Sequence, residues 1–365
     1  MTRRVLIIGG YGNFGNFIAK SLAAEPSIKV IIAGRSAEKA QKLAQELNTE
    51  WAFIDIQRDL DQSLSQIKPD IVIHTSGPFQ IQGYDVAEVC IRNGCHYIDL
   101  ADAREFVAKA GTLDAAAKAA NVLIISGASS VPCLTSAIID EYRNEFQALN
   151  SVDYAITTAQ QTNRGLATTQ AVLSYAGKPF TTLIDGTMKT IYGWQNLHFY
   201  KFPTLGWRAL GNCNVPDLAL FPERYASLKT IRFYAGLELP FMHIGLWLLT
   251  WLVRFGVMPS LDKGASILLG LSRLFDCFGS DRSGFYMKLS GIASNGQKKS
   301  ITFDLTARDG IGPYIPSTPA ILLAKRLARG EITARGAQSC VGLITLPDYL
   351  GALDNKRISW GASIS

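Results

Sequence analysis

Short apolar runs alternate with helical patterns through the first third of the chain. Val5–Ile8 and Val30–Ala33 are uninterrupted apolar runs, and similar runs lie in the segments 50–56, 69–79, 95–102 and 121–130. Such runs are typical of strands buried on both faces of a parallel sheet. Between them, apolar residues recur at helical spacing, for example from Phe14 to Leu22, and a further helix is expected over about 105–120. The pattern predicts an α/β fold, a doubly wound parallel sheet of the Rossmann type.

The pattern changes beyond residue 150. The segment 152–159 predicts a strand, 168–177 a helix, and the segment 283–310 a hairpin of an antiparallel or mixed sheet, so we expect a second, α+β domain. Phe241–Met258 is apolar on all sides of its predicted helix and is too short to cross about 30 Å of hydrocarbon, which takes about 20 residues. Three settings stay open for this segment: the protein core, a dimer interface, or the surface of a lipid layer.

The first apolar run leads into a glycine-rich turn, "GGYGNFG". Gly10, Gly12 and Gly15 have the spacing G-x-G-x-x-G between a predicted strand and a predicted helix. In a Rossmann unit these glycines allow a tight turn, close approach of a pyrophosphate, and close packing of helix on strand. The amides of Tyr11, Asn13 and Phe14 would then surround the phosphates. The turn predicts a dinucleotide site.

The end of the second predicted strand bears on which dinucleotide binds. NAD-binding folds usually have an acidic residue here, which binds the ribose 2′-hydroxyl. This chain has Gly34-Arg35-Ser36, with Lys39 one turn further. A guanidinium pairs with a phosphate through two hydrogen bonds, so the sequence favours NADP. The alternative is a solvated Arg35 beside an N-cap serine.

Other polar residues follow the third and fourth predicted strands. Asp55 ends the third strand, where it could accept a hydrogen bond from an adenine amino group. Ser76, Gly77, Pro78 and Phe79 follow the fourth, where their backbone would lie beside the ribose and nicotinamide. The carboxyl ends of parallel strands meet at one edge of the sheet, so we expect these residues to gather there.

Composition narrows the class of protein. About half of the 365 residues are apolar and 18% are charged, which suits a globular protein of two domains. Six cysteines without C-x-x-C spacing and four scattered histidines predict reduced thiols and no metal site. The first residues contain no apolar leader, so we expect a cytoplasmic protein.

Charge is divided unequally along the chain. Residues 1–150 have 14 Lys/Arg and 17 Asp/Glu, whereas the remainder has 22 and 13. The second part is therefore expected to meet an anion, with Arg164, Arg208 and Arg232 as candidate anchors for an acidic substrate. No basic and aromatic stripe indicates a nucleic-acid partner.

The quoted motifs together resemble one family. "GGYGNFG", "AGRS", "SGPFQIQGYDVAEVCIRNGCHYIDLAD" and "GASSVPCLTSAIID" are similar to the saccharopine dehydrogenase-like NADP-binding family. The resemblance implies a Rossmann domain over residues 1–140, completed by C-terminal helices at about 315–365. It also implies an α+β domain over 141–314 that covers the cofactor and often dimerises. Gly127–Pro132 departs from the lysine-pathway members, so an amino-acid substrate is not implied.

The resemblance also directs attention to the fifth predicted strand. Tyr97 and Asp99 match the family's Y-x-D, and Asp102 follows closely. A carboxyl buried beside a nicotinamide could act as a general acid or base. The alternative for Asp99 is a purely structural hydrogen-bonding role.

The sequence therefore predicts an NADP-dependent oxidoreductase that acts on a small carbonyl, imine or enoyl substrate. The rival predictions are a sensor that binds NADP without turnover, and an enzyme similar to the trans-acting enoyl reductases of lipid metabolism. A homodimer is expected, and peripheral lipid contact through Phe241–Met258 stays open.

Overall fold

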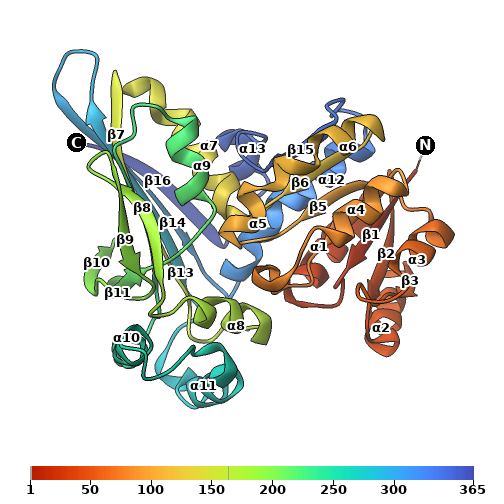
Figure 1. Ribbon diagram of the computed structural model, residues 1–365, viewed down its shortest axis with the longest axis horizontal. Helices are drawn as coiled ribbons and strands as arrows, with labels where there is room; N and C mark the ends of the chain where they lie inside the picture. The colour runs from red at the N-terminus through yellow and green to blue at the C-terminus, as the bar shows by residue number, and fades with distance from the viewer. Residues whose placement is uncertain (1, 163) are drawn as a thin grey trace. The chain divides into compact units, whose positions relative to one another are not determined.

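The computed structural model describes residues 2–162 and 164–365, which divide into two compact units (Figure 1). Unit 1 contains Met1–Leu134 and Tyr314–Ala352, and unit 2 contains Thr135–Pro313 and Leu353–Ser365. Among the residues described, no helix is long and apolar enough to cross a membrane.

Unit 1 is built around a seven-stranded parallel sheet, so the predicted fold class is confirmed for this part. Its strands are β1 (Arg3–Ile8), β2 (Ile28–Gly34), β3 (Glu50–Phe53), β4 (Ile71–His74), β5 (His96–Asp99), β6 (Leu123–Ser126) and β15 (Gly336–Ser339). They lie in the order β15-β6-β5-β4-β1-β2-β3. The chain reverses direction across the sheet between β1 and β4, and this reversal point is where open α/β sheets bind ligands.

Helices cover the parallel sheet on both faces. The helices of unit 1 are α1 (Asn13–Ala23), α2 (Ala37–Leu47), α3 (Leu60–Ile67), α4 (Asp85–Arg92), α5 (Arg104–Ala108), α6 (Asp114–Ala119), α12 (Thr318–Ala328) and α13 (Leu346–Gly351). Leu6 and Ile8 of β1 pack with residues of α3, α4 and α6 in one core cluster. Val5 and Ile7 point the opposite way and are also fully buried. Burial on both faces explains the uninterrupted apolar runs of the sequence.

One predicted helix of unit 1 is divided. The sequence suggested a helix over 105–120, but α5 ends at Ala108 and α6 begins at Asp114, with a 3-10 turn over Ala110–Leu113 between them. Gly111 lies in this turn, and glycine weakens a helix because it loses the most backbone freedom on folding.

Unit 2 is an α+β unit, which confirms the second part of the fold prediction. Its strands are β7 (Ala148–Thr157), β8 (Pro179–Ile184), β9 (Thr187–Tyr192), β10 (His198–Phe202), β11 (Gly206–Asn212), β12 (Thr230–Gly236), β13 (Ser283–Ile292), β14 (Lys298–Ala307) and β16 (Ile358–Ile364). Its helices are α7 (Thr135–Tyr142), α8 (Leu166–Ser174), α9 (Asp217–Arg224), α10 (Pro240–Arg254) and α11 (Ala265–Arg273).

The main sheet of unit 2 is mixed, with the order β10-β11-β12-β7-β13-β14-β16, and β8 and β9 form a separate hairpin. In this main sheet β12 and β7 are parallel to each other, and all other neighbouring strands are antiparallel. The family resemblance implies that C-terminal helices at about 315–365 complete the first domain. The last of these residues instead form β16, which pairs with β14 of the mixed sheet.

Candidate functional site

The glycine-rich turn between β1 and α1 is tightly closed. Gly9 has φ +81°, a conformation that favours glycine, and its carbonyl accepts a hydrogen bond from the Gly12 amide at 2.8 Å. A Cβ on Gly15 would lie 2.2 Å from the Gly9 carbonyl oxygen, so only glycine lets α1 begin this close to the turn. Gly12 is the N-cap of α1 and has no side chain to accept the first helical amides. An N-terminus of this kind suits an anion.

Gly9 is a further residue of this turn, which the G-x-G-x-x-G spacing does not include. A Cβ at this position would lie 2.6 Å from the hydroxyls of Thr75 and Ser76, which follow β4. The Thr75 hydroxyl donates to the carbonyls of Ile8 and Gly9, so it fixes the turn to the neighbouring strand. The doubled glycine at 9 and 10 was the available sequence signal.

The end of β2 carries cations without carboxylate partners. Arg35 and Lys39 are exposed, and among the described residues neither side chain forms an ion pair or hydrogen bond. Ser36 is the N-cap of α2, because its side chain accepts from the Lys39 amide at 3.3 Å. Glu38, also exposed, lies in the first turn of the same helix. Two unpaired cations beside a hydroxyl provide donors for an anionic group.

Tyr11 links the glycine turn to the end of β2. Its hydroxyl accepts a hydrogen bond from the Ser36 amide at 2.9 Å. A Cβ on Gly34 would lie 2.6 Å from the Tyr11 ring, so the ring occupies the space beside Gly34. Packing against the Tyr11 ring is therefore one reason for a glycine at position 34.

The predicted residues after β3 and β4 lie at the same edge of the sheet. The register pairs Ile8 with both Ala33 and His74, so β1, β2 and β4 end side by side. Asp55 lies beyond β3, where it accepts a hydrogen bond from the Gln57 amide at 3.1 Å. The Gly77–Pro78 peptide is cis, and Gln82 Nε2 donates to the carbonyls of Ser76 and Pro78.

Phe79 differs from its neighbours because its side chain belongs to the core. It is 5% exposed, and its ring lies 5.0 Å from the His74 ring and 5.4 Å from the Phe106 ring, between centroids. Only its backbone is therefore available to a ligand.

Asp99 lies at the end of β5 and is fully buried. Its Oδ1 accepts hydrogen bonds from the amides of Ala101 and Gly127, at 2.9 and 2.8 Å, and from the Ser126 hydroxyl at 3.1 Å. Burial raises the pKa of this carboxyl to about 6, although these hydrogen bonds oppose the rise. The three bonds connect the ends of β5 and β6.

The side chains of Tyr97 and His74 contact each other within the parallel sheet, near the edge at which Asp99 lies. The Tyr97 hydroxyl lies 3.1 Å from His74 Nδ1, and both side chains are 1% exposed. Burial lowers the pKa of His74 to about 4 and raises the pKa of Tyr97 well above its usual value. Both groups are therefore uncharged at neutral pH.

Asp102 is the most accessible of the three predicted catalytic residues. It is partly buried, and its Oδ1 accepts a hydrogen bond from Gln80 Nε2 at 3.0 Å. Burial raises the pKa of its carboxyl, and the bond from Gln80 opposes the rise. Asp102 thus combines a raised pKa with partial access to solvent.

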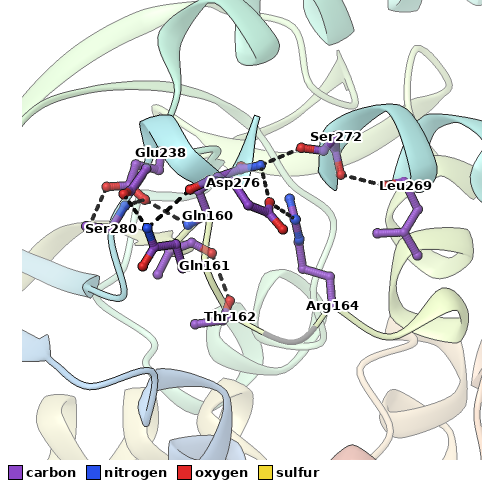
Figure 2. A network of polar contacts seen from close by, with 11 residues as sticks. Gln160, Gln161, Thr162, Arg164, Glu238, Leu269, Ser272, Asp276 and Ser280 are labelled. Atoms are coloured by element: carbon purple, nitrogen blue, oxygen red, sulfur yellow. Dashed lines mark hydrogen bonds and ion pairs between the residues drawn. The ribbon is translucent and has the colours of Figure 1, made fainter. Parts of the chain in front are cut away.

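The polar network of unit 2 pairs its charges internally. Glu238 accepts hydrogen bonds from the amides of Gln160 and Ser280, and Figure 2 shows these groups converging on its carboxylate. Arg208 pairs with Glu238 at 3.3 Å, Arg164 with Asp276, and Arg232 with Asp153 at 3.3 Å. The three arginines proposed as substrate anchors therefore already have carboxylate partners.

Cysteines and metal ligands add no further site. All six cysteines are free thiols, of which only Cys277 is exposed. Over residues 2–162 and 164–365, no group of three or more His, Cys, Asp or Glu side chains is arranged to hold a metal ion.

Unit 1 is similar in sequence to a known family of NADP-binding domains. Residues 5–125 match the family described as saccharopine dehydrogenase NADP binding domain. A curated relative, the trans-acting enoyl reductase of Mycobacterium leprae (strain TN), is 27% identical over 137 residues, which are 35% of this chain and 33% of that protein. The match thus spans about a third of the curated relative's length.

Solved structures extend the likeness to the fold of the whole chain. The apo saccharopine dehydrogenase (L-Glu forming) from Saccharomyces cerevisiae has a TM-score of 0.65 and 15% identity, covering 99% of this chain and 100% of that chain. At this identity the likeness concerns the fold alone. Unit 1 is, by its family match and its strand order, a domain that binds a nicotinamide dinucleotide.

Proposed function

Because residues 5–125 match the family described as saccharopine dehydrogenase NADP binding domain, we propose that the protein is an NADP(H)-dependent oxidoreductase. The observation that carries the choice of NADP is the pair of exposed, unpaired cations Arg35 and Lys39 beside Ser36. They hold the 2′-phosphate of the adenosine, while the amides that follow Gly12 hold the pyrophosphate. Asp55 binds the adenine, and Ser76–Pro78 lie beside the nicotinamide ribose.

A bound nicotinamide supplies or accepts the hydride, and the protein orients the reactants and handles the proton. We assign the proton to Asp102, because its pKa is raised and it is not fully buried. Asp99 and Tyr97 hold the edge of the sheet in position, because both side chains are fully buried. Substrates in this proposal are small carbonyl, imine or enoyl compounds.

Among these classes, enoyl compounds are favoured by one specific observation. The chain is 27% identical over 137 residues to a protein named as a trans-acting enoyl reductase. An NADPH oxidation assay against panels of carbonyl, imine and enoyl compounds tests the whole proposal. Binding of NADPH without turnover of any compound would favour the sensor instead.

The choice of cofactor is tested separately through Arg35→Ala. A charge-assisted contact contributes about 1.5–3 kcal/mol, so the dissociation constant for NADPH should rise by roughly 10- to 100-fold. The dissociation constant for NADH should stay within about twofold, because NADH lacks the phosphate. Isothermal titration measures both constants.

Lys42→Ala is the matched control. Lys42 is an exposed cation on α2, and its removal changes the net charge by the same amount. Equal weakening of NADPH and NADH by Arg35→Ala, or an equal effect of Lys42→Ala on NADPH, would overturn the assignment of the phosphate site.

A further inference from the structure

Exposed apolar side chains gather on one part of unit 2. Among the described residues, nineteen large hydrophobic side chains are exposed, and ten of them lie between residues 241 and 278. We name these ten the apolar patch: Phe241, Leu248, Leu252, Phe255, Val257, Met258, Ile267, Leu271, Leu274 and Phe278. Monomeric soluble proteins rarely expose so many neighbouring apolar groups, and such surfaces usually mark an interaction site.

Two helices, α10 and α11, each present an apolar stripe to the outside. Leu248, Leu252 and Phe255 recur at helical spacing along α10 and just beyond its end. Ile267, Leu271 and Leu274 do the same along α11. The full burial that the sequence allowed for residues 241–258 is therefore wrong for one face of α10.

The opposite faces of these helices pack into a common core. Val253 of α10 and Ala265 of α11 belong to one buried cluster with Trp194. Phe241, at the start of α10, also contacts Phe275, at 5.1 Å between ring centroids. In Figure 1 both helices lie at the same end of unit 2. The two helices therefore share one core, and their outward stripes lie at the same end of unit 2.

Charge on this surface has one sign. Arg254, Lys263 and Arg273 are exposed, and none forms an ion pair within the described residues. Arg254 is held inside the unit, because it donates a hydrogen bond to Gln195 and lies over the Tyr192 and Trp251 rings. The two acidic residues of the segment are less exposed and are balanced by cations outside it. Asp276 pairs with Arg164, and the pKa of Asp262 is lowered by the Ser260 hydroxyl and, to a smaller extent, by the Lys178 charge. An apolar surface with a cationic border suits the anionic headgroup region of a lipid layer.

A second copy of the chain fits this surface less well. In a two-fold symmetric dimer the same patch faces itself, so Arg254, Lys263 and Arg273, which have no carboxylate partner, would meet like charges. The geometry points to an anionic bilayer surface as the partner: we propose that the apolar patch inserts shallowly among the acyl chains while Lys263 and Arg273 bind lipid phosphates. The helix α10 has 15 residues and a length of about 22 Å, so it lies along the layer rather than crossing it.

The experiment is flotation of the full-length protein with vesicles. We expect it to rise with vesicles of mixed phosphatidylcholine and phosphatidylglycerol and far less with phosphatidylcholine alone. Leu252→Glu/Leu271→Glu, with one change on each helix, should lower the vesicle-bound fraction at least about tenfold. Lys263→Gln/Arg273→Gln should lower it by about 30-fold, because each cation near an anionic surface strengthens binding roughly fivefold.

The matched control is Met188→Glu/Trp207→Glu, which changes two exposed apolar residues of the same unit, at 54% and 61% exposure, outside the patch. It should float as the unmodified protein does, and circular dichroism checks that each variant is folded.

Failure of the unmodified protein to float with anionic vesicles would overturn the proposal. So would an equal loss in the control. A patch variant that changes from dimer to monomer in sedimentation, without vesicle binding by the parent, would assign the patch to a second copy. All these changes lie in unit 2 and the proposed cofactor residues lie in unit 1, so NADPH binding should be unchanged and this test is separate from that of the proposed function.

Discussion

The buried carboxyl of Asp99 should make the stability of unit 1 depend on pH. Its pKa rises from 3.8 to about 6 on folding because the side chain is fully buried. The folded state therefore binds the proton more tightly than the unfolded state does. The stability due to this group is fully present below about pH 4 and is lost as the pH rises through about 6. Replacement by asparagine, which does not titrate, should abolish this dependence.

The size of the effect follows from the change in pKa. A rise from 3.8 to about 6 corresponds to about 3 kcal/mol, which ionised Asp99 costs the folded state at neutral pH. In Asp99→Asn, the amide Oδ1 can still accept from the amides of Ala101 and Gly127 and from Ser126. The free energy of unfolding of the variant minus that of the parent should therefore increase by about 3 kcal/mol between about pH 4 and about pH 7. Other titrating groups cancel in this difference.

Hydrogen exchange with mass spectrometry provides the assay. Peptides that contain β5 and β6 report the opening free energy of this part of unit 1 in both proteins across the pH range. A difference that stays constant with pH, or that decreases as the pH rises, would refute the reasoning. Asp99→Ala is the companion variant: it leaves three buried donors without an acceptor and should destabilise at every pH, by roughly 3 kcal/mol or more.

Two further predictions concern the glycine turn. Gly15→Ala places a Cβ 2.2 Å from the Gly9 carbonyl oxygen, so it should lower stability by about 1–3 kcal/mol and weaken dinucleotide binding. Thermal unfolding and NADPH titration measure both effects, and Gly111→Ala, which meets no atom within 4 Å, is the control. Equal behaviour of the two variants would contradict the packing argument. Tyr11→Phe removes the acceptor of the Ser36 amide and should cost about 1 kcal/mol in urea unfolding, and an unchanged midpoint would show that this hydrogen bond contributes nothing.

The sequence predicted those features of unit 1 that arise from local patterns. Strands buried on both faces leave uninterrupted apolar runs, and β1, β2 and β4 were found in this way. Helix starts were equally visible where a side chain caps them, as Ser36 does for α2. Because parallel strands end at one edge, knowing their directions was sufficient to bring Arg35 and Ser76 to the same side of the sheet.

Features that depend on distant partners were not predictable. β15 and β16 have only four and seven residues and weak apolar patterns, and they join different sheets. Their assignment depends on pairing with β6 and β14, far away in the chain. The internal pairing of Arg164, Arg208 and Arg232 was hidden for the same reason, since each partner comes from another segment.

Gly34 was correctly noted in the sequence, but the structure gives a different reason for the glycine. From the sequence, the glycine marked the absence of an acidic residue that would bind a ribose. In the structure, the Tyr11 ring fills the space beside it, and a Cβ there would lie 2.6 Å from that ring. An aspartate at position 34 would therefore have to displace the Tyr11 ring, whatever cofactor binds. It follows that Tyr11 and Gly34 are a matched pair, and that under the proposed NADP specificity a change of preference toward NAD requires substitution of both together with Arg35.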